Sequence, residues 1–206
     1  MTTPEEWMTQ ARDAVREKPG AALRWLAQAG LGVGRDLVDE ASDAKGEVLG
    51  TTADAARADL VAVLAVTQSP ADFATTITTL YNQGDNDVKR GVLRGLNLLT
   101  ERGALPDEAV DAGVALVHDS FRANDPRLVA SGMGAFAGAH LDQETWRQGV
   151  IKLVFMDVSF AAVAGLDERR DAELERMARD LVRERSSAGR VITTDLSTLA
   201  EPIAKG

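Results

Sequence analysis

The sequence has 206 residues, of which 45% are hydrophobic and only 4% aromatic, and it carries a net charge of −9 at pH 7. This acidic balance argues against sequence-independent binding of nucleic acid, which needs a dominant basic surface. The sequence contains no cysteine, which excludes disulfides, thiolate metal sites and a cysteine nucleophile.

The first helix is predicted to begin at Pro4. Thr3 can cap it and Glu6 can complete a capping box. The Pro-Gly pair at positions 19–20 ends this helix, and a second, shorter helix is predicted over residues 21–29. The acidic N-terminus lacks the apolar segment of a signal peptide, and no apolar run is long enough to span a bilayer. We therefore expect a cytoplasmic protein without direct membrane insertion.

Residues 30–50 are rich in glycine and aspartate, which predicts an ordered but irregular connection with at most a short helix. The glycines at positions 30, 32 and 34 resemble a phosphate-binding loop. However, Arg35 occupies the place of the last glycine of G-x-G-x-x-G, and no strand is predicted before it. The interpretation as a plain loop is favoured.

From residue 51 onward, helix starts recur at intervals of roughly 20 residues, which is typical of stacked helix pairs. The predicted starts lie near Thr52, Ser69, Asp85, Pro106, Asp125 and Asp142. We predict an all-α single domain over residues 1–206, built of stacked antiparallel helix hairpins in a HEAT-like or α-solenoid-like arrangement. It would comprise N-terminal helices with the irregular connection (1–50), a helical core (51–190) and a C-terminal tail (191–206).

The last long helix has the clearest pattern. Residues at helical spacing form one stripe along it, which is apolar except for its last member: Leu174, Met177, Ala178, Leu181, Val182 and Arg185. Gly189 is predicted to end this helix, and one weak helix is expected in the tail, over residues 196–200. Because Arg185 falls on the stripe, its aliphatic stem is expected to pack inward.

Two further polar features could bind a ligand. Arg90, Arg94, Asn97 and Glu101 share one helix face, either as a solvated surface, which is favoured, or as a guanidinium pair facing a cleft for a carboxylate or phosphate. Lys152 interrupts an apolar run. The favoured interpretation is that its side chain reaches the surface or forms a structural ion pair. The alternative is that Lys152 binds an anion.

Catalytic patterns are weak. The two histidines, His118 and His140, are too few for a histidine-based metal site, and structural or surface roles are favoured for both. Neither G-x-S-x-G nor G-x-x-x-x-G-K-[ST] occurs. An enzyme that uses Lys152 or a histidine as acid or base is the least favoured hypothesis. We predict no catalytic residues, no metal and no cofactor.

The order and spacing of several segments resemble the EboA family of metabolite traffic proteins over most of residues 33–200. The segments are Val33-Gly34-Arg35, residues 85–96 (DNDVKRGVLRGL), residues 122–126 (RANDP), residues 146–152 (WRQGVIK), residues 165–170 (GLDERR), Glu184-Arg185 and Ala188-Gly189-Arg190. The resemblance implies a helical, non-enzymatic helper in bacterial secondary metabolism. Such proteins are encoded beside a UbiA-type membrane prenyltransferase, a TatD-like hydrolase, a sugar-phosphate-cyclase-like protein and TIM-barrel isomerase-like proteins.

The same resemblance supplies a set of candidate ligand-binding residues, because these positions match its motifs. They are Arg35, Arg90, Arg94, Asn124, Trp146, Lys152, Arg185 and Arg190.

Two functional hypotheses follow. A protein that handles a small metabolite or its precursor, with a possible anionic ligand, predicts a concave pocket where Arg90, Arg94 and Lys152 converge. A scaffold for proteins of the same gene cluster, including the UbiA-type prenyltransferase, predicts a contiguous exposed apolar patch.

Overall fold

The computed structural model describes residues 2–202, which contain twelve α-helices and three short 3₁₀ helices. The first half comprises α1 (Pro4–Glu17), η1 (Pro19–Ala21), α2 (Ala22–Gly32), α3 (Thr52–Thr67), α4 (Pro70–Gln83), α5 (Asn86–Glu101), η2 (Asp107–Ala109) and α6 (Val110–Ser120). The second half comprises α7 (Pro126–Ser131), α8 (Ala135–His140), α9 (Gln143–Phe155), η3 (Phe160–Ala162), α10 (Leu166–Arg169), α11 (Ala172–Ser187) and α12 (Thr194–Ala200). No strand occurs in the described residues, which contain only an isolated bridge between Leu37 and Thr51.

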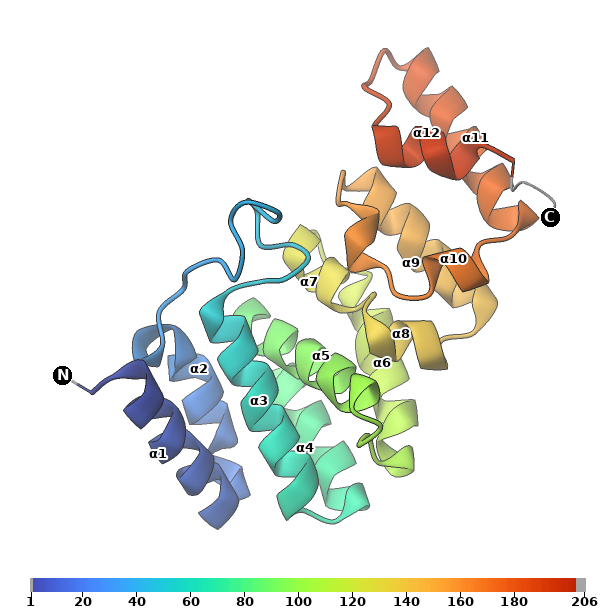
Figure 1. Ribbon diagram of the computed structural model, residues 1–206. Coiled ribbons are helices and arrows are strands. Elements are labelled where there is room, and N and C mark those ends of the chain that lie inside the picture. Colours follow the sequence, from blue (N-terminus) through green and yellow to red (C-terminus); the bar gives the residue numbers. More distant parts are fainter. Residues whose placement is uncertain (1, 203–206) are drawn as a thin grey trace.

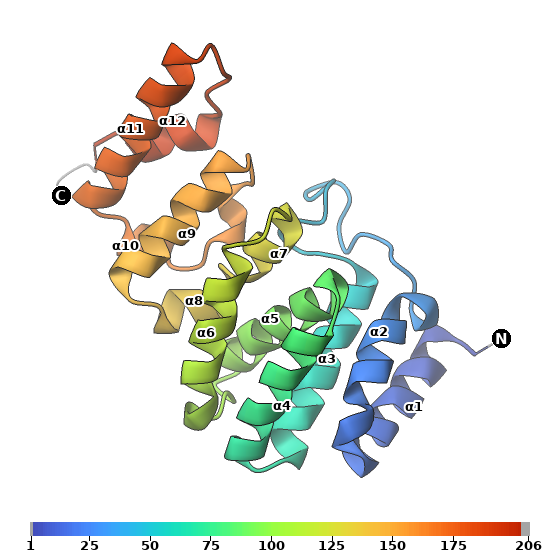
Figure 2. The same cartoon turned by 180° about the vertical axis from the view of Figure 1, so that it is seen from behind.

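The helices from α1 to α6 lie side by side as one block (Figures 1 and 2). The chain continues through the short helices α7 and α8 to α9, and ends in the α11–α12 pair at the end opposite the N-terminus. The all-α prediction is confirmed for the described residues, whereas the HEAT-like arrangement stays a prediction. None of the described helices is both long and apolar enough to cross a membrane.

Local capping explains where most helices begin. Thr3 and Thr51 each form a complete capping box with the acidic residue three positions later. The other predicted starts have single caps, from Ser69, Asp85, Asp125 and Asp142. The start expected near Pro106 is a 3₁₀ turn, and α6 itself begins at Val110. The helices α8 and α10 were not predicted.

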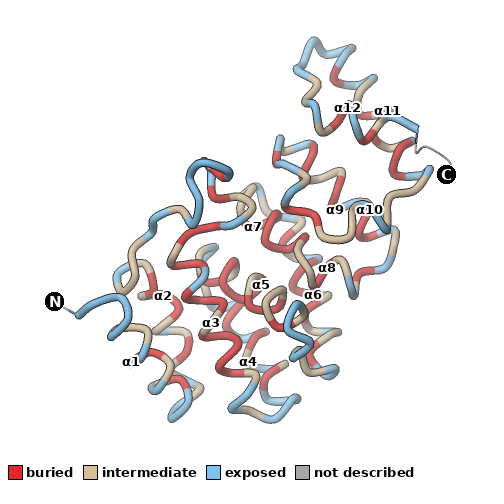
Figure 3. The backbone as a smooth tube through the Cα atoms, viewed as in Figure 1, coloured by how far each residue is buried: buried red, intermediate tan, exposed pale blue. Residues whose placement is uncertain are grey.

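The closest helix packing joins α3 to α5, rather than α3 to its sequence neighbour α4. Two glycines of α5 permit this approach. A Cβ atom at Gly91 would lie 2.4 Å from Cβ of Arg57, and one at Gly95 would lie 2.5 Å from Cβ of Val61. Since real Cβ atoms do not come so close, only glycine allows α5 to lie this near α3. Many of the buried residues lie on α3 and α5 (Figure 3).

The connection between α2 and α3 is irregular, as predicted, but it begins only after Gly32, because Gly30 and Gly32 still belong to α2. Asp43 organises its second half. The buried Asp43 carboxylate accepts backbone N–H bonds from Glu47, Val48, Leu49 and Gly50, at 2.9, 3.0, 2.7 and 3.4 Å. Burial alone would raise the pKa of this carboxyl, but the four hydrogen bonds together lower it. The loop over residues 43–50 therefore has a fixed shape.

The C-terminal pair is joined to α9 by Arg185. Its guanidinium donates to the carbonyls of Val154 and Phe155, at 3.1 and 3.0 Å, and pairs with Asp157 at 2.7 Å. Arg185 is buried, as its place on the apolar stripe predicted. Gly189 follows the end of α11 with φ +64°, which confirms its predicted role as the helix terminator.

Candidate functional site

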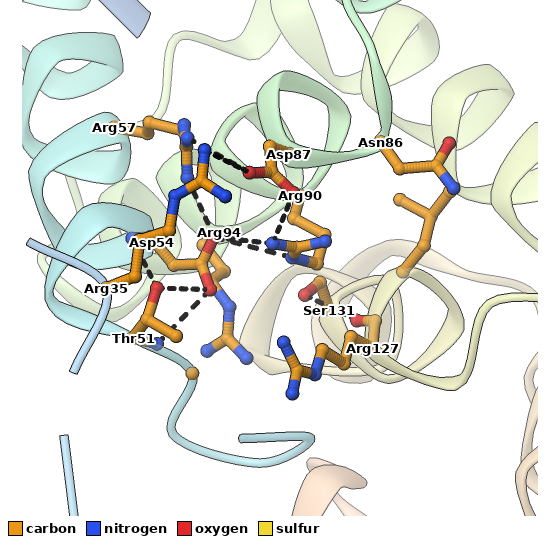
Figure 4. A network of polar contacts seen from close by, with 12 residues as sticks. Arg35, Thr51, Asp54, Arg57, Asn86, Asp87, Arg90, Arg94, Arg127 and Ser131 are labelled. Carbon is orange, nitrogen blue, oxygen red and sulfur yellow. Dashed lines mark hydrogen bonds and ion pairs between the residues drawn. The ribbon is translucent and has the colours of Figure 1, made fainter. Parts of the chain in front are cut away.

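A buried network of charges joins α3 to α5 (Figure 4). The Asp54 carboxylate is fully buried and lies 3.2 Å from Nη1 of Arg57 and 3.3 Å from Nη2 of Arg90. Asp87 binds the same two guanidinium groups, at 3.3 and 2.8 Å. Nε of Arg57 also donates to the carbonyl of Leu26, which ties α2 to the network. The network thus connects three helices.

Two carboxylates face two buried guanidinium groups in this network, and the exposed Arg35 approaches Asp87 from outside, at 4.0 Å. Burial alone would raise the pKa of Asp87, but the charges of Arg90 and Arg57 outweigh that effect and lower it. Buried charges are tolerated when they are paired and hydrogen-bonded in this way. Arg57 and Arg90 therefore hold helices together, because both guanidinium groups bind Asp54 and Asp87.

Arg94 lies one turn after Arg90 on α5, but its environment differs. Its Nη1 and Nη2 atoms donate to the carbonyls of Val48 and Glu47, at 3.0 and 3.3 Å. Its buried Nε has no hydrogen-bond acceptor, and the side chain forms no ion pair with any described residue. Burial is the main influence on the pKa of this guanidinium and lowers it. Arg94 is thus a largely buried cation whose hydrogen bonds go to neutral carbonyls, while the carboxylates of Asp54 and Asp43 act on it from beyond ion-pair distance.

Arg94 lines a cavity of about 580 Å³. The walls come from α3, α5, the ends of α7 and α8, the loop over residues 43–50 and the segment over residues 161–164. The aliphatic lining residues are Val48, Leu49, Ala55, Ala58, Leu98, Ala130, Ala135, Ala161, Ala162, Val163 and Ala164. The polar ones are Asp59, Arg94, Asn97, Glu101, Arg102 and Ser131. This volume suits a small organic molecule.

Asn97 fixes the wall between α7 and α8. Its Nδ2 donates to the carbonyl of Ser131 at 2.9 Å, and its Oδ1 accepts the backbone N–H of Phe136 at 3.0 Å. The second bond caps α8, whose own N-cap residue, Gly134, has no side chain that could do so. The amide of Asn97 therefore shapes the cavity and has its main hydrogen bonds satisfied by the protein.

Residues 38–201 match the family described as "Metabolite traffic protein EboA". The chain belongs to the EboA family. No curated protein and no solved structure matches the chain. The match covers the loop over residues 43–50 and all the helices around the cavity, whereas Arg35 lies outside it. The resemblance read from the sequence motifs is confirmed.

The expected convergence of Arg90, Arg94 and Lys152 at one pocket is wrong for this EboA protein, because only Arg94 lines the cavity. Arg90 is held away from it by Asp54 and Asp87. Lys152 is half-buried in the last turn of α9 and forms no ion pair with a described residue. The favoured prediction of a solvated face for Arg90 and Arg94 is also wrong, since Arg90 is buried and the guanidinium of Arg94 lies against a loop.

The remaining candidate residues are dispersed. Trp146 is fully buried, and its Nε1 donates to the carbonyl of Ala164 behind the cavity wall. Arg35 is exposed, with a guanidinium nitrogen 4.0 Å from a carboxylate oxygen of Asp87. Asn124 and Arg190 are exposed and line none of the hollows around Arg94. Arg185 has the structural role described above.

Sequence reasoning missed Asp43, Asp54 and Arg57. Thr51 and Asp54 form a T-x-x-D pattern before a helix, which was a detectable sign of a capping box. Nothing local marks Asp43 as a loop organiser or Arg57 as buried. Within residues 2–202, no three acidic or histidine side chains gather as metal ligands would.

Proposed function

We propose that this EboA protein is a non-enzymatic helper in bacterial metabolite traffic that holds a small anionic molecule, such as a precursor of a secondary metabolite, in the cavity beside Arg94. The family description supports a role in handling a metabolite. The single observation that carries the proposal is Arg94, a largely buried cation on the cavity wall without a carboxylate partner among the described residues.

The comparison with other buried arginines supports an anionic ligand. Arg57, Arg90 and Arg185 each have a carboxylate within 3.3 Å, whereas Arg94 has only carbonyl oxygens. Removing a guanidinium from water without a counterion is costly, and a bound anion would offset that cost. The Nε of Arg94 also has no acceptor among the described residues, so the hydrogen-bonding capacity of this guanidinium is only partly used.

The other charges of the lining favour the same assignment. Asp59 is neutralised by Arg12, at 2.7 Å. Glu101 and Arg102 are exposed, and their opposite charges add no net charge to the lining. Arg94 therefore has no ion-pair partner in the cavity, although the charges of Asp54 and Asp43 act on it from a longer distance.

Native mass spectrometry of the protein purified from its own cells tests this proposal. Ala55 is exposed on α3 and lines the cavity, so Ala55→Trp fills the space without altering the core. The matched control is Ala115→Trp, at an exposed position of α6 outside the cavity. We expect a co-purifying anion with the wild type and the control but not with Ala55→Trp. Equal recovery of the same molecule from all three proteins would refute the cavity as its site.

A scaffold for biosynthetic enzymes, including a UbiA-type membrane prenyltransferase, is the second candidate. A HEAT-like stack of helices would offer the extended surface that it needs. Its supporting observation is that Phe155 and Val191 are 51% and 79% exposed while Arg185 binds the carbonyls of both, which places two exposed apolar residues together. Phe155→Ser would then weaken capture of the prenyltransferase in detergent extracts, and Ala55→Trp would not. The opposite pattern would exclude this surface.

A further inference from the structure

A second hollow of about 490 Å³ adjoins the cavity beside Arg94. The two share Val48, Leu49 and Ala161 in their linings, so they meet along these three residues. Leu49 is 43% exposed although it is a large apolar residue. Its backbone is fixed, because its N–H donates to Asp43, so the loop holds this side chain in place between the two hollows. Val48, Leu49 and Ala161 thus border both hollows, which together are named the groove.

The lining of this groove has a distinct chemistry. Aliphatic residues form most of the first hollow, and neither hollow includes an aromatic side chain. Flat rings such as nucleobases are usually held by stacking on aromatic residues, which this groove does not offer. Alkyl chains need only aliphatic contact surface that excludes water. The lining therefore favours a flexible aliphatic body over a planar aromatic one.

The charges define where the ends of such a molecule would lie. Arg94 lines the first hollow, and its guanidinium has no ion-pair partner among the described residues. The second hollow contains Ser42, Lys45 and Ser159, and its carboxylates are occupied: Asp43 by four backbone N–H groups, and Glu47 by Lys45 at 3.9 Å. The distribution suits a molecule with its anionic group beside Arg94 and an aliphatic chain that crosses Leu49.

We propose that the ligand is a single-chain aliphatic anion, with its head group at Arg94 and its chain along Val48, Leu49 and Ala161 into the second hollow. This inference rests on the proposed function, because it assigns a chemical class to the molecule in the same cavity. A chain that lies in the groove buries one more methylene with each carbon added, and each methylene strengthens binding roughly fourfold.

Calorimetric titration of the full chain with straight-chain carboxylates from butanoate to dodecanoate, below their micellar concentrations, tests the inference. We expect the affinity to rise roughly fourfold per methylene and then to level off where the groove ends. The alcohol of the same length should bind more weakly, since it lacks the charge that faces Arg94.

Ala161→Trp provides the matching variant, because Ala161 is exposed and lies where the hollows meet. We expect it to bind butanoate like the wild type but to level off at a shorter chain, whereas Ala115→Trp behaves like the wild type. If carboxylates bind with an affinity independent of chain length, the inference is overturned and an anion site at Arg94 remains. If no carboxylate of any length binds, both the inference and the anionic ligand of the proposed function are refuted.

Discussion

Replacing Asp54 by asparagine should destabilise the protein strongly, because this change removes one of two negative charges from the buried network. Asp54 is fully buried, and its Oδ1 faces the guanidinium groups of Arg57 and Arg90. Its Oδ2 accepts from N and Oγ1 of Thr51, at 3.2 and 3.0 Å. Asparagine keeps the shape of the side chain but removes its charge, so Asp87 becomes the one carboxylate that Arg57 and Arg90 share within this network.

Breaking a buried ion pair by removing one partner costs about 3–5 kcal/mol. For a domain of this size, 1 kcal/mol shifts the melting temperature by about 2–4 °C, so we expect Tm to fall by roughly 10 °C. Urea and thermal unfolding followed by circular dichroism at neutral pH measure both quantities. The helices should remain after the substitution, but α2, α3 and α5 would be held together less firmly.

Asp13→Asn is the matched control. Asp13 pairs with Arg16 at 3.0 Å, but the two side chains are 66% and 53% exposed, and such surface pairs contribute about 0–1 kcal/mol. The same chemical change is therefore made once in the interior and once in water. If the two variants differ in stability by less than about 1 kcal/mol, the network is not what holds these helices together.

Three further outcomes are expected. Gly95→Ala should lower the free energy of unfolding by about 1–3 kcal/mol in urea titrations, because the new Cβ meets α3, whereas Gly20→Ala, with nothing within 4 Å, should cost less than about 0.5 kcal/mol. Asp43→Asn should speed amide hydrogen exchange at residues 47–50, whose N–H groups lose a charged acceptor, and unchanged exchange would contradict the loop's dependence on this carboxylate. The Arg147 guanidinium lowers the pKa of Asp171 to about 2, so the stability that this carboxylate provides is complete above its ordinary pKa. The difference in stability between the wild type and Asp171→Asn should therefore shrink as the pH falls from about 4 to about 2, and a difference that grows over that range would contradict the pairing.

Local signals in the sequence determined most of the secondary structure. A cap such as Thr3, Ser69 or Asp142 binds a backbone N–H three residues further on, so the information for these helix starts lies within one turn. The buried position of Arg185 was also predictable, because an apolar stripe at helical spacing specifies which face turns inward.

Only the tertiary structure separated Arg90 from Arg94, which lie four residues apart on one helix face. Arg90 meets Asp54 from 36 residues earlier, and Arg94 meets the carbonyl of Val48 from 46 residues earlier. Likewise, the N-cap residue of α8 has no side chain to cap the helix. The cap comes from Asn97, whose Oδ1 accepts the N–H of Phe136, 39 residues further on. The cavity itself is formed by segments that are distant in the chain, and no local pattern encodes which of them meet. The local sequence therefore determined most of the helix starts and the apolar stripes, and the packing of the helices decided that Arg90 received carboxylate partners while Arg94 was left at a cavity without an ion-pair partner.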